Sequence, residues 1–404
     1  MKKLLSAVPM TILATLLCLT PAYATEDVVD VPMDSPEDVA IAFLSDATEN
    51  MYLYTENDLD VYSINSLPVA VDNQLESMTY SVDGKSIALS DFLENMTLVN
   101  NKVSYYKYIR SSQDFVVNDF TQTYTVDDVQ KFDNTATVNI TELLTWQYAD
   151  YDLPSAARIH YNVIMVNDGT RWRVAEVIAP EEVFDQQYII GNKPFSLSTE
   201  ISAFDEATLA EQEYLDNLQT QGLLSANQQT PGAKSGYDIE AAVAYARKWA
   251  MDRNSPPFLD FASDCMNFAS QCVYVGLGGS SSSHDTNYMD TTGSNTWYWN
   301  DYDAWVSCED FRDYIESSDA QLVTEHTQTT GDLPVWYPGE WTGSVAHVEG
   351  RDGPLAHAIF ITDSASPTRK DMYFCAHTTD RLNERVSAYY PTGDMYFISP
   401  QYLE

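Results

Sequence analysis

The fold of the C-terminal part of the chain is decided by residues 264–272, which read DCMNFASQC. Asp264 is a good N-cap, so the stretch predicts a helix that begins near this residue and stops at Gly276. A cysteine in the first turn meets unpaired amide N–H groups and the positive end of the helix dipole, which stabilise a thiolate. We expect the Asp264 carboxylate to bond backbone amides, because facing the sulfur it would oppose that effect. Cys265 is therefore a candidate nucleophile, and Cys272 an ordinary core cysteine.

A thiolate nucleophile needs a base, and a histidine can serve. Three histidines follow in the same part of the chain: His347, His357 and His377. His357 opens the apolar run 358–361 and His377 ends the run 372–376, so both runs predict strands. Antiparallel pairing across the loop around Ser366 would bring His357 and His377 to the same end of a hairpin. The competing interpretation is a buried structural cysteine with ordinary strand-end histidines.

Other segments complete this C-terminal unit, for which we expect residues 237–404. Asp238 predicts the N-cap of an amphipathic helix, and a short helix is expected around residues 311–315. Aromatic side chains gather between these helices: Trp297, Trp299, Tyr302 and Trp305. Such rings can line a groove for peptide or sugar, and Trp297, Trp299 and Trp305 are our groove candidates. Core packing is the alternative for at least half of the cluster.

A different pattern precedes this unit. Ser35-Pro36-Glu37-Asp38 predicts a helix start, and residues 135–140 and 159–165 alternate as strands do. Asn167-Asp168-Gly169-Thr170 is typical of a hairpin turn. Residues 25–198 therefore predict a separate α+β domain with an antiparallel sheet, which we interpret as a binding or spacer module. A helical segment and a linker rich in Gln, Ser, Gly and Pro are expected over residues 199–236.

The N-terminus has the pattern of a secretory signal peptide. Lys2 and Lys3 precede an apolar run from Leu4 to Leu19, and Ala22-Tyr23-Ala24 has the small-residue spacing of a cleavage site. We expect residues 1–24 to be removed and the mature protein to be secreted, with the cell wall as a candidate location. No later stretch has about 18 uninterrupted apolar residues, so no membrane span is predicted.

The charge balance excludes some partners. The chain has 60 Asp and Glu residues against 21 Lys and Arg, a formal net charge of −39. Such a surface repels phosphate backbones, so we expect no nucleic-acid partner. We also expect a monomer.

Residues 237–404 resemble the putative amidase domain family of secreted bacterial proteins, a branch similar to the NlpC-type, papain-like cysteine peptidases. The motif that carries the resemblance is DCMNFASQ at 264–271, close to the family's D-C-T-N-F-V-S-Q. The order of further motifs agrees: Gly331-Asp332-Leu333, then His357-Ala358-Ile359, then His377-Thr378-Thr379-Asp380. The resemblance implies an α+β fold in which a central helix packs on an antiparallel sheet.

The resemblance also implies the roles of single residues. Cys265 takes the place of the nucleophile, His357 that of the general base, and His377 that of the polar orienter, with Asp380 as a substitute. His347 lies in a long insertion before His357 and competes for the base role. Asp264, Asn267 and Gln271 are candidates for support of the site or of the oxyanion, although the last two could equally face outward. The reaction implied is hydrolysis of an amide bond without a cofactor, with peptide or cell-wall peptidoglycan as substrate.

Two alternatives stay open. The three histidines, with Cys375 or Cys265, supply enough ligands for a zinc-dependent hydrolase, although no tight ligand pair is present. A non-catalytic extracellular binding or adhesion module that kept the fold is the other alternative.

Overall fold

A computed structural model describes the chain over residues 35–53, 79–82, 85–167, 169, 171–179, 196–222, 237–282, 303–316, 325–328, 341–349, 355–366, 368–392 and 395–398. The expected signal peptide, Trp297 and Trp299 lie outside these residues. Within them, no helix is long and apolar enough to cross a bilayer.

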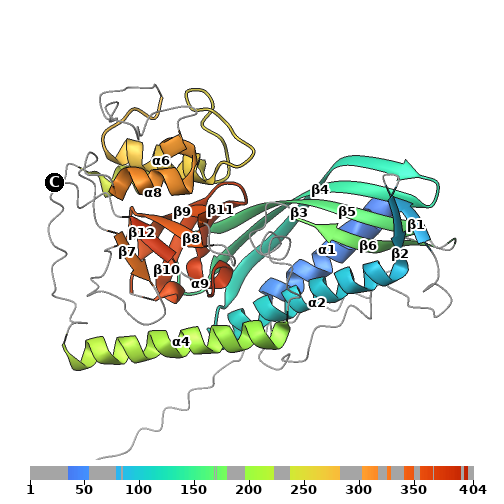
Figure 1. The fold of residues 1–404 in the computed structure, drawn as a ribbon, viewed down its shortest axis with the longest axis horizontal. Helices are drawn as coiled ribbons and strands as arrows, with labels where there is room; N and C mark the ends of the chain where they lie inside the picture. Colours follow the sequence, from blue (N-terminus) through green and yellow to red (C-terminus); the bar gives the residue numbers. More distant parts are fainter. Residues whose placement is uncertain are drawn as a thin grey trace, which may run out of the picture.

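One large antiparallel sheet organises the described residues (Figure 1). Its strand order is β3-β4-β5-β11-β10-β9-β8-β12-β7, with β6 pairing on β5 beside this path. The N-terminal strands are β3 (Val117–Phe132), β4 (Thr135–Tyr148), β5 (Ser155–Asn167) and β6 (Trp172–Ile178). The C-terminal strands are β7 (Glu325–Gln328), β8 (Val345–Glu349), β9 (Leu355–Ser364), β10 (Met372–Ala376), β11 (Asp380–Arg385) and β12 (Met395–Ile398). A separate hairpin is formed by β1 (Thr79–Val82) and β2 (Lys85–Ala88). The expected α+β class with an antiparallel sheet is confirmed.

The N-terminal strands carry their helices on one face (Figure 1). These helices are α1 (Pro36–Tyr52) and α2 (Leu89–Ser112). Ser35 caps α1 as predicted, because its Oγ accepts from the Asp38 amide at 3.2 Å. Alternation in β4 buries Ala136, Val138 and Ile140, and the apolar side chains of β5 complete the same core. The predicted turn after β5 is also confirmed, since β5 pairs with β6 and Gly169 has φ +91°.

A long helix, α4 (Leu197–Thr220), follows. Its buried residues are Phe204 and Leu218. Phe204 packs with Tyr105, Tyr106 and Ile109 of α2, so one turn of α4 is attached to the N-terminal part. Farther along, Glu211 accepts a bond from the Arg369 amide at 3.3 Å, which ties the helix to the C-terminal part as well.

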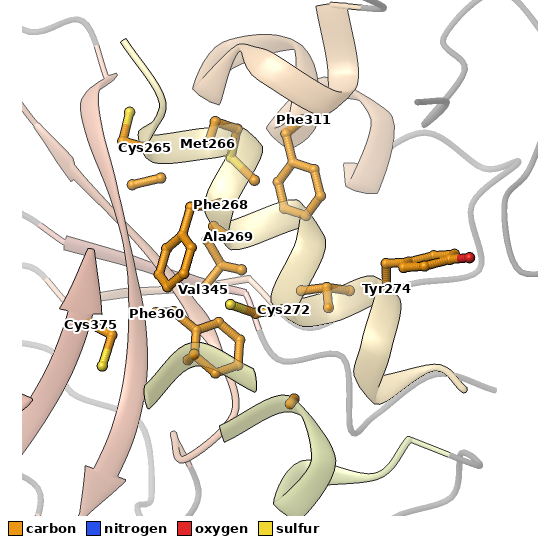
Figure 2. Packing of buried hydrophobic residues seen from close by; sticks show 14 of the residues in the cluster. Cys265, Met266, Phe268, Ala269, Cys272, Tyr274, Phe311, Val345, Phe360 and Cys375 are labelled. Atoms are coloured by element: carbon orange, nitrogen blue, oxygen red, sulfur yellow. The ribbon is translucent and has the colours of Figure 1, made fainter. Parts of the chain in front are cut away.

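The C-terminal strands carry helices on both faces. One face is covered by α5 (Ile239–Trp249), α6 (Cys265–Gly276), α7 (Asp303–Val306) and α8 (Cys308–Glu316). The other face carries the short helices η3 (Arg369–Asp371) and α9 (Val386–Tyr389). The predicted helices and the β9–β10 hairpin are confirmed. Residues of α6 are buried on all sides, among the sheet, α5 and α7 (Figure 2).

The two expected units share the sheet. Strand β5 pairs with β11, with Arg158 opposite Asp380 and Ala156 opposite Leu382. The N-terminal strands therefore continue the C-terminal sheet directly at β11. The expected domain bounds, 25–198 and 237–404, stay a prediction.

Candidate active site

Cys265 is the first residue of α6 and Asp264 is its N-cap, as the sequence predicts. The thiol is 6% exposed and lies at the start of the helix, beyond the closely packed Phe268 and Cys272 (Figure 2). Amide N–H groups in the first turn of a helix have no acceptor within the helix, so a negative sulfur is stabilised at this position. The fold thus supplies the position on which the nucleophile hypothesis depends.

Three groups bond the Cys265 sulfur. They are the thiol of Cys308, the ring of His357 and the backbone N–H of Ala358. The bond from Cys308 and then the two interactions with His357 lower the pKa of Cys265 well below its ordinary value, although burial acts in the opposite direction. The structure therefore brings Cys265 and His357 together from segments about 90 residues apart, and the arrangement favours a thiolate.

Cys308 is a site residue that the sequence interpretation missed. It begins α8 and is 8% exposed. Its bond to Cys265 and its burial raise its pKa well above the ordinary value, and Glu309 adds to this effect. Of the two sulfurs, Cys265 carries the charge because His357 faces it, whereas Cys308 has a carboxylate next to it. No sequence motif links two cysteines so far apart, and the short helix expected around residues 311–315 starts earlier in the structure, at Cys308.

His357 lies in β9, near its start, and is 3% exposed. Across the sheet it is opposite Val348 of β8, and its ring centroid lies 6.1 Å from that of Tyr390. Pairing with β8 fixes the backbone of His357, whereas the pairing of β9 with β10 ends at Phe360. The histidine is therefore held rigidly beside the sulfur, as a general base needs.

His347 has a different environment from the base. It is fully buried opposite Ala358, and its ring packs against Phe311 at 5.8 Å. Its Nε2 lies 3.3 Å from the Met266 sulfur, and its Nδ1 has no hydrogen-bond partner among the described residues. Burial lowers the pKa of His347 to about 4. A neutral core histidine does not fit the competing base role.

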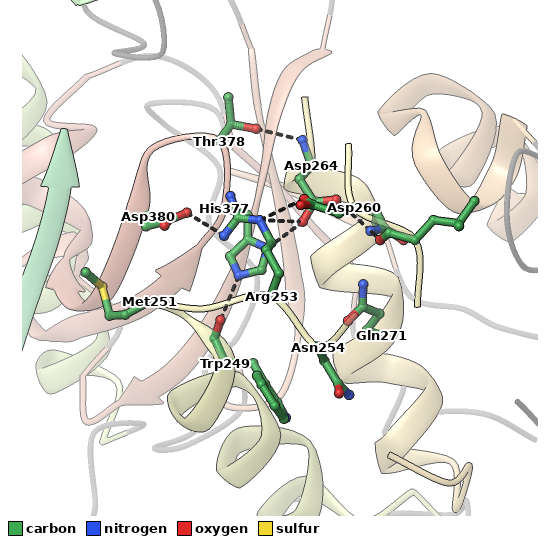
Figure 3. A network of polar contacts seen from close by, with 12 residues as sticks. Trp249, Met251, Arg253, Asn254, Asp260, Asp264, Gln271, His377, Thr378 and Asp380 are labelled. Carbon is green, nitrogen blue, oxygen red and sulfur yellow. Dashed lines mark hydrogen bonds and ion pairs between the residues drawn. The ribbon is translucent and has the colours of Figure 1, made fainter. Parts of the chain in front are cut away.

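His377 follows β10, but it does not bond His357. Its Nδ1 lies 2.5 Å from Asp264 Oδ2 and its Nε2 lies 2.8 Å from the Trp249 carbonyl oxygen (Figure 3). Both ring nitrogens are thus committed, and neither is left to orient the base. His377 lies in the turn after β10, beyond the last residue that pairs with β9, so the register does not place it opposite His357. The two histidines contact neighbouring residues at the start of α6, His377 the carboxylate of Asp264 and His357 the sulfur of Cys265. His377 therefore does not orient His357, although that role was expected, and contacts Asp264 instead.

Asp264 differs from the expectation in one respect. Its carboxylate makes no capping bond to the amides of α6. Instead, Oδ1 accepts from the Asn267 side chain at 2.6 Å, and Oδ2 faces His377 and Arg253. The expectation of amide bonding was wrong because Asn267, Arg253 and His377 take both oxygens. The carboxylate charge is thereby neutralised by groups other than the thiol.

Asp380, the substitute orienter, is also committed elsewhere. Its carboxylate pairs with Arg158 and Arg253, each at 2.8 Å. Among the described residues, these partners do not include His357.

The two polar residues of α6 face inward. Asn267 is 1% exposed; it donates to Leu259 O and Asp264 and accepts from the Trp305 indole at 2.7 Å. Gln271 is 3% exposed and accepts from the Tyr245 hydroxyl at 2.6 Å. Outward exposure is therefore wrong for both residues. Their bonds hold α6 against neighbouring segments, which fits support of the site.

Trp305 is a core residue in the structure. It is 1% exposed and its ring stacks on Phe258 at 6.3 Å. The groove interpretation is thus wrong for Trp305, because the Asn267 bond and this packing enclose the ring. Trp297 and Trp299 lie outside the described residues and stay groove candidates.

The described part of the chain contains no group of three or more His, Cys, Asp or Glu side chains arranged to hold a metal ion. All four described cysteines are free thiols. The histidines invoked for zinc are separated by their partners, since His347 faces a methionine sulfur and His377 faces Asp264.

Residues 236–398 match the family model described as "Putative amidase domain". No curated protein and no solved structure matches the chain. The matched range contains Cys265, Cys308 and the three histidines, so the family match and the buried thiol site fall on the same segment. The match supports a hydrolase that acts on amide bonds.

Proposed function

We propose that the protein is a secreted cysteine amidase or peptidase in which Cys265 is the nucleophile and His357 the general base. The observation that carries the proposal is the Cys265 sulfur, which begins α6 and accepts bonds from His357 and the Ala358 amide. The family match to an amidase supports the class of reaction. A central helix bearing the thiol, packed on antiparallel strands that bear the histidine, also supports a papain-like, NlpC-type arrangement.

The chemistry is acyl transfer. The Cys265 thiolate attacks the carbonyl carbon of the amide, and the imidazolium of His357 holds the proton that the thiol has lost. Amide N–H groups in the first turn of α6, including that of Cys265, stabilise the oxyanion that forms on the carbonyl oxygen. The C–N bond then breaks as His357 protonates the leaving amine. Water, deprotonated by His357, releases the acid from the thioester and regenerates the thiol.

The proposed substrate is a peptide outside the cell, and peptidoglycan is the first candidate. Residues 1–24 support export, although they lie outside the described residues. The net charge of −39 disfavours acidic polymers at long range. We propose that the protein acts as a monomer.

Incubation of the full chain with peptidoglycan and with casein tests this proposal. Cys265→Ala and His357→Ala should each abolish hydrolysis while the thermal midpoint stays close to that of the wild type, because acid–base help alone contributes about 10²–10⁴-fold. Cys272→Ala is the matched control, since it removes a thiol from the same helix. Near-normal turnover by the Cys265 variant would refute the nucleophile assignment.

A further inference from the structure

A polar chain supports the segment that leads into the site. It begins at His377, whose two ring nitrogens face Asp264 Oδ2 at 2.5 Å and the Trp249 carbonyl oxygen at 2.8 Å. Both ring nitrogens are thus engaged, one by a carboxylate oxygen and the other by a backbone carbonyl oxygen. The ring of His377 also stacks on Phe268, with centroids 4.0 Å apart. The end of α5 and the cap of α6 are thus joined by one imidazole.

Arg253 extends this chain. Its Nη1 lies 2.8 Å from Asp380 Oδ1, and its Nε lies 3.5 Å from Asp264 Oδ2 (Figure 3). The same Nε is 3.3 Å from Asp260 Oδ1. One guanidinium therefore connects the carboxylate that precedes Cys265 with the first residue of β11.

The chain ends on a residue from the other part of the molecule. Arg158 lies in β5, opposite Asp380 in the strand register. Its Nη1 donates to Asp380 Oδ2 at 2.8 Å and to the Met251 carbonyl at 2.6 Å. Asp380 is thus held by an arginine on each oxygen. The segment between α5 and α6 is held at two carbonyls, Trp249 by His377 and Met251 by Arg158.

We propose that Arg158 is a positioning residue for the Cys265 centre, acting through Asp380 and Met251 on the segment that places the start of α6. This inference rests on the proposed function and deepens it. Arg158 lies outside the matched range 236–398. The N-terminal part therefore contributes to the site and is more than a spacer.

The consequence of losing Arg158 follows from these contacts. Without Arg158, Asp380 is paired only with Arg253, through one of its two oxygens. The Met251 carbonyl loses the hydrogen bond that Arg158 donates. The segment before α6 keeps the bonds from His377 to Trp249 and from Asn267 to Leu259, but it is no longer fixed at Met251. The start of α6 is therefore less firmly placed, and the sulfur can shift relative to His357. Misplacement by about 1 Å can cost about 10²-fold in rate. When the pKa of the thiol rises by one unit, the fraction of thiolate at any pH below the original pKa falls to about one tenth.

The test uses the full chain and needs no substrate. The rate constant for alkylation of Cys265 by iodoacetamide is measured against pH, with the modified residue identified by mass spectrometry. Arg158→Ala should shift the alkylation profile to higher pH, slowing the reaction by up to about tenfold on the acidic limb and leaving it unchanged near pH 9.5. Arg158→Lys should recover part of the loss. His160→Ala is the matched control, because it changes the next residue on the same face of β5, which contacts Thr141. It should leave the pH profile unchanged.

Two outcomes overturn the proposal. One is a pH profile of Arg158→Ala that coincides with that of the wild type. The other is an equal change at every pH, accompanied by a lower thermal midpoint and no recovery with lysine, which indicates a merely structural role. Failure of the proposed function is separate, because it would appear as hydrolysis by Cys265→Ala whatever the alkylation profile of the Arg158 variants. If a substrate is found, Arg158→Ala should lower kcat by up to about 10²-fold with little change in KM.

Discussion

Glu142 should make the stability of the fold depend on pH. Its side chain is fully buried between α1 and the sheet. It accepts bonds from the hydroxyls of Tyr124 at 2.6 Å, Tyr161 at 3.0 Å and Thr48 at 3.4 Å. Burial nevertheless raises the pKa of Glu142 from 4.5 to about 7, because three neutral donors do not replace the water that the ionised carboxylate loses.

The sign and the magnitude follow from linkage between protonation and folding. The folded pKa lies above the unfolded one, so the stabilisation from protonated Glu142 is complete below pH 4.5 and is lost as pH rises through about 7. The difference between the two values, at about 1.4 kcal/mol per pH unit, corresponds to about 3 kcal/mol. Glu142→Gln keeps the shape and stays neutral throughout, so it should remove this part of the pH dependence.

Urea unfolding of the full chain at pH 4.5 and pH 8.5 measures the effect. Between pH 4.5 and pH 8.5, the free energy of unfolding of the wild type should fall by about 3 kcal/mol more than that of Glu142→Gln. Glu213→Gln, on the exposed surface of α4, is the control and should behave as the wild type does. Equal pH dependence of the wild type and Glu142→Gln would refute the argument that desolvation dominates at this site.

Two further changes test the candidate site. Cys308→Ala removes the thiol bond to Cys265, so the pKa of Cys265 should rise and its alkylation should slow at pH 6 but not at pH 9.5; an unchanged profile would contradict the assigned bond. Asp264→Asn breaks the buried pair with His377 and should lower the free energy of unfolding by about 3–5 kcal/mol in urea. The matched control is Asp260→Asn, which changes a half-exposed partner of the same Arg253 and should cost less than about 1 kcal/mol.

Much of the local structure could be predicted from the sequence because it follows from local rules. The caps Ser35, Asp238 and Asp264 start helices where predicted, and alternation locates β4 and β5. The meeting of Cys265 and His357 could be anticipated only through the resemblance, since the distance between them depends on how α6 lies on the sheet. The partners of His377 could not be predicted either, because it lies in the turn after β10 and bonds Asp264 and Trp249, which are distant in the sequence.

Strand β11 shows why the joint between the two parts could not be predicted. It reads DRLNER, which has no apolar alternation and is typical of an exposed loop. In the fold these charges are buried, and their partners come from distant segments. Glu384 accepts from the Tyr148 hydroxyl at 2.5 Å and lies 4.0 Å from Arg110, whereas Arg385 pairs with Asp150.

A buried charge without its partner costs several kcal/mol, so β11 can be a central strand only where the N-terminal part supplies these groups. The same strand begins with Asp380, which Arg158 holds from β5. The charges that make β11 unlike a strand in sequence are therefore the groups that join the two parts of the chain. Because Asp380 also bonds Arg253, the joint and the support of the candidate site are one continuous set of contacts. A change on the N-terminal side of this joint should thus reach the thiol without touching it.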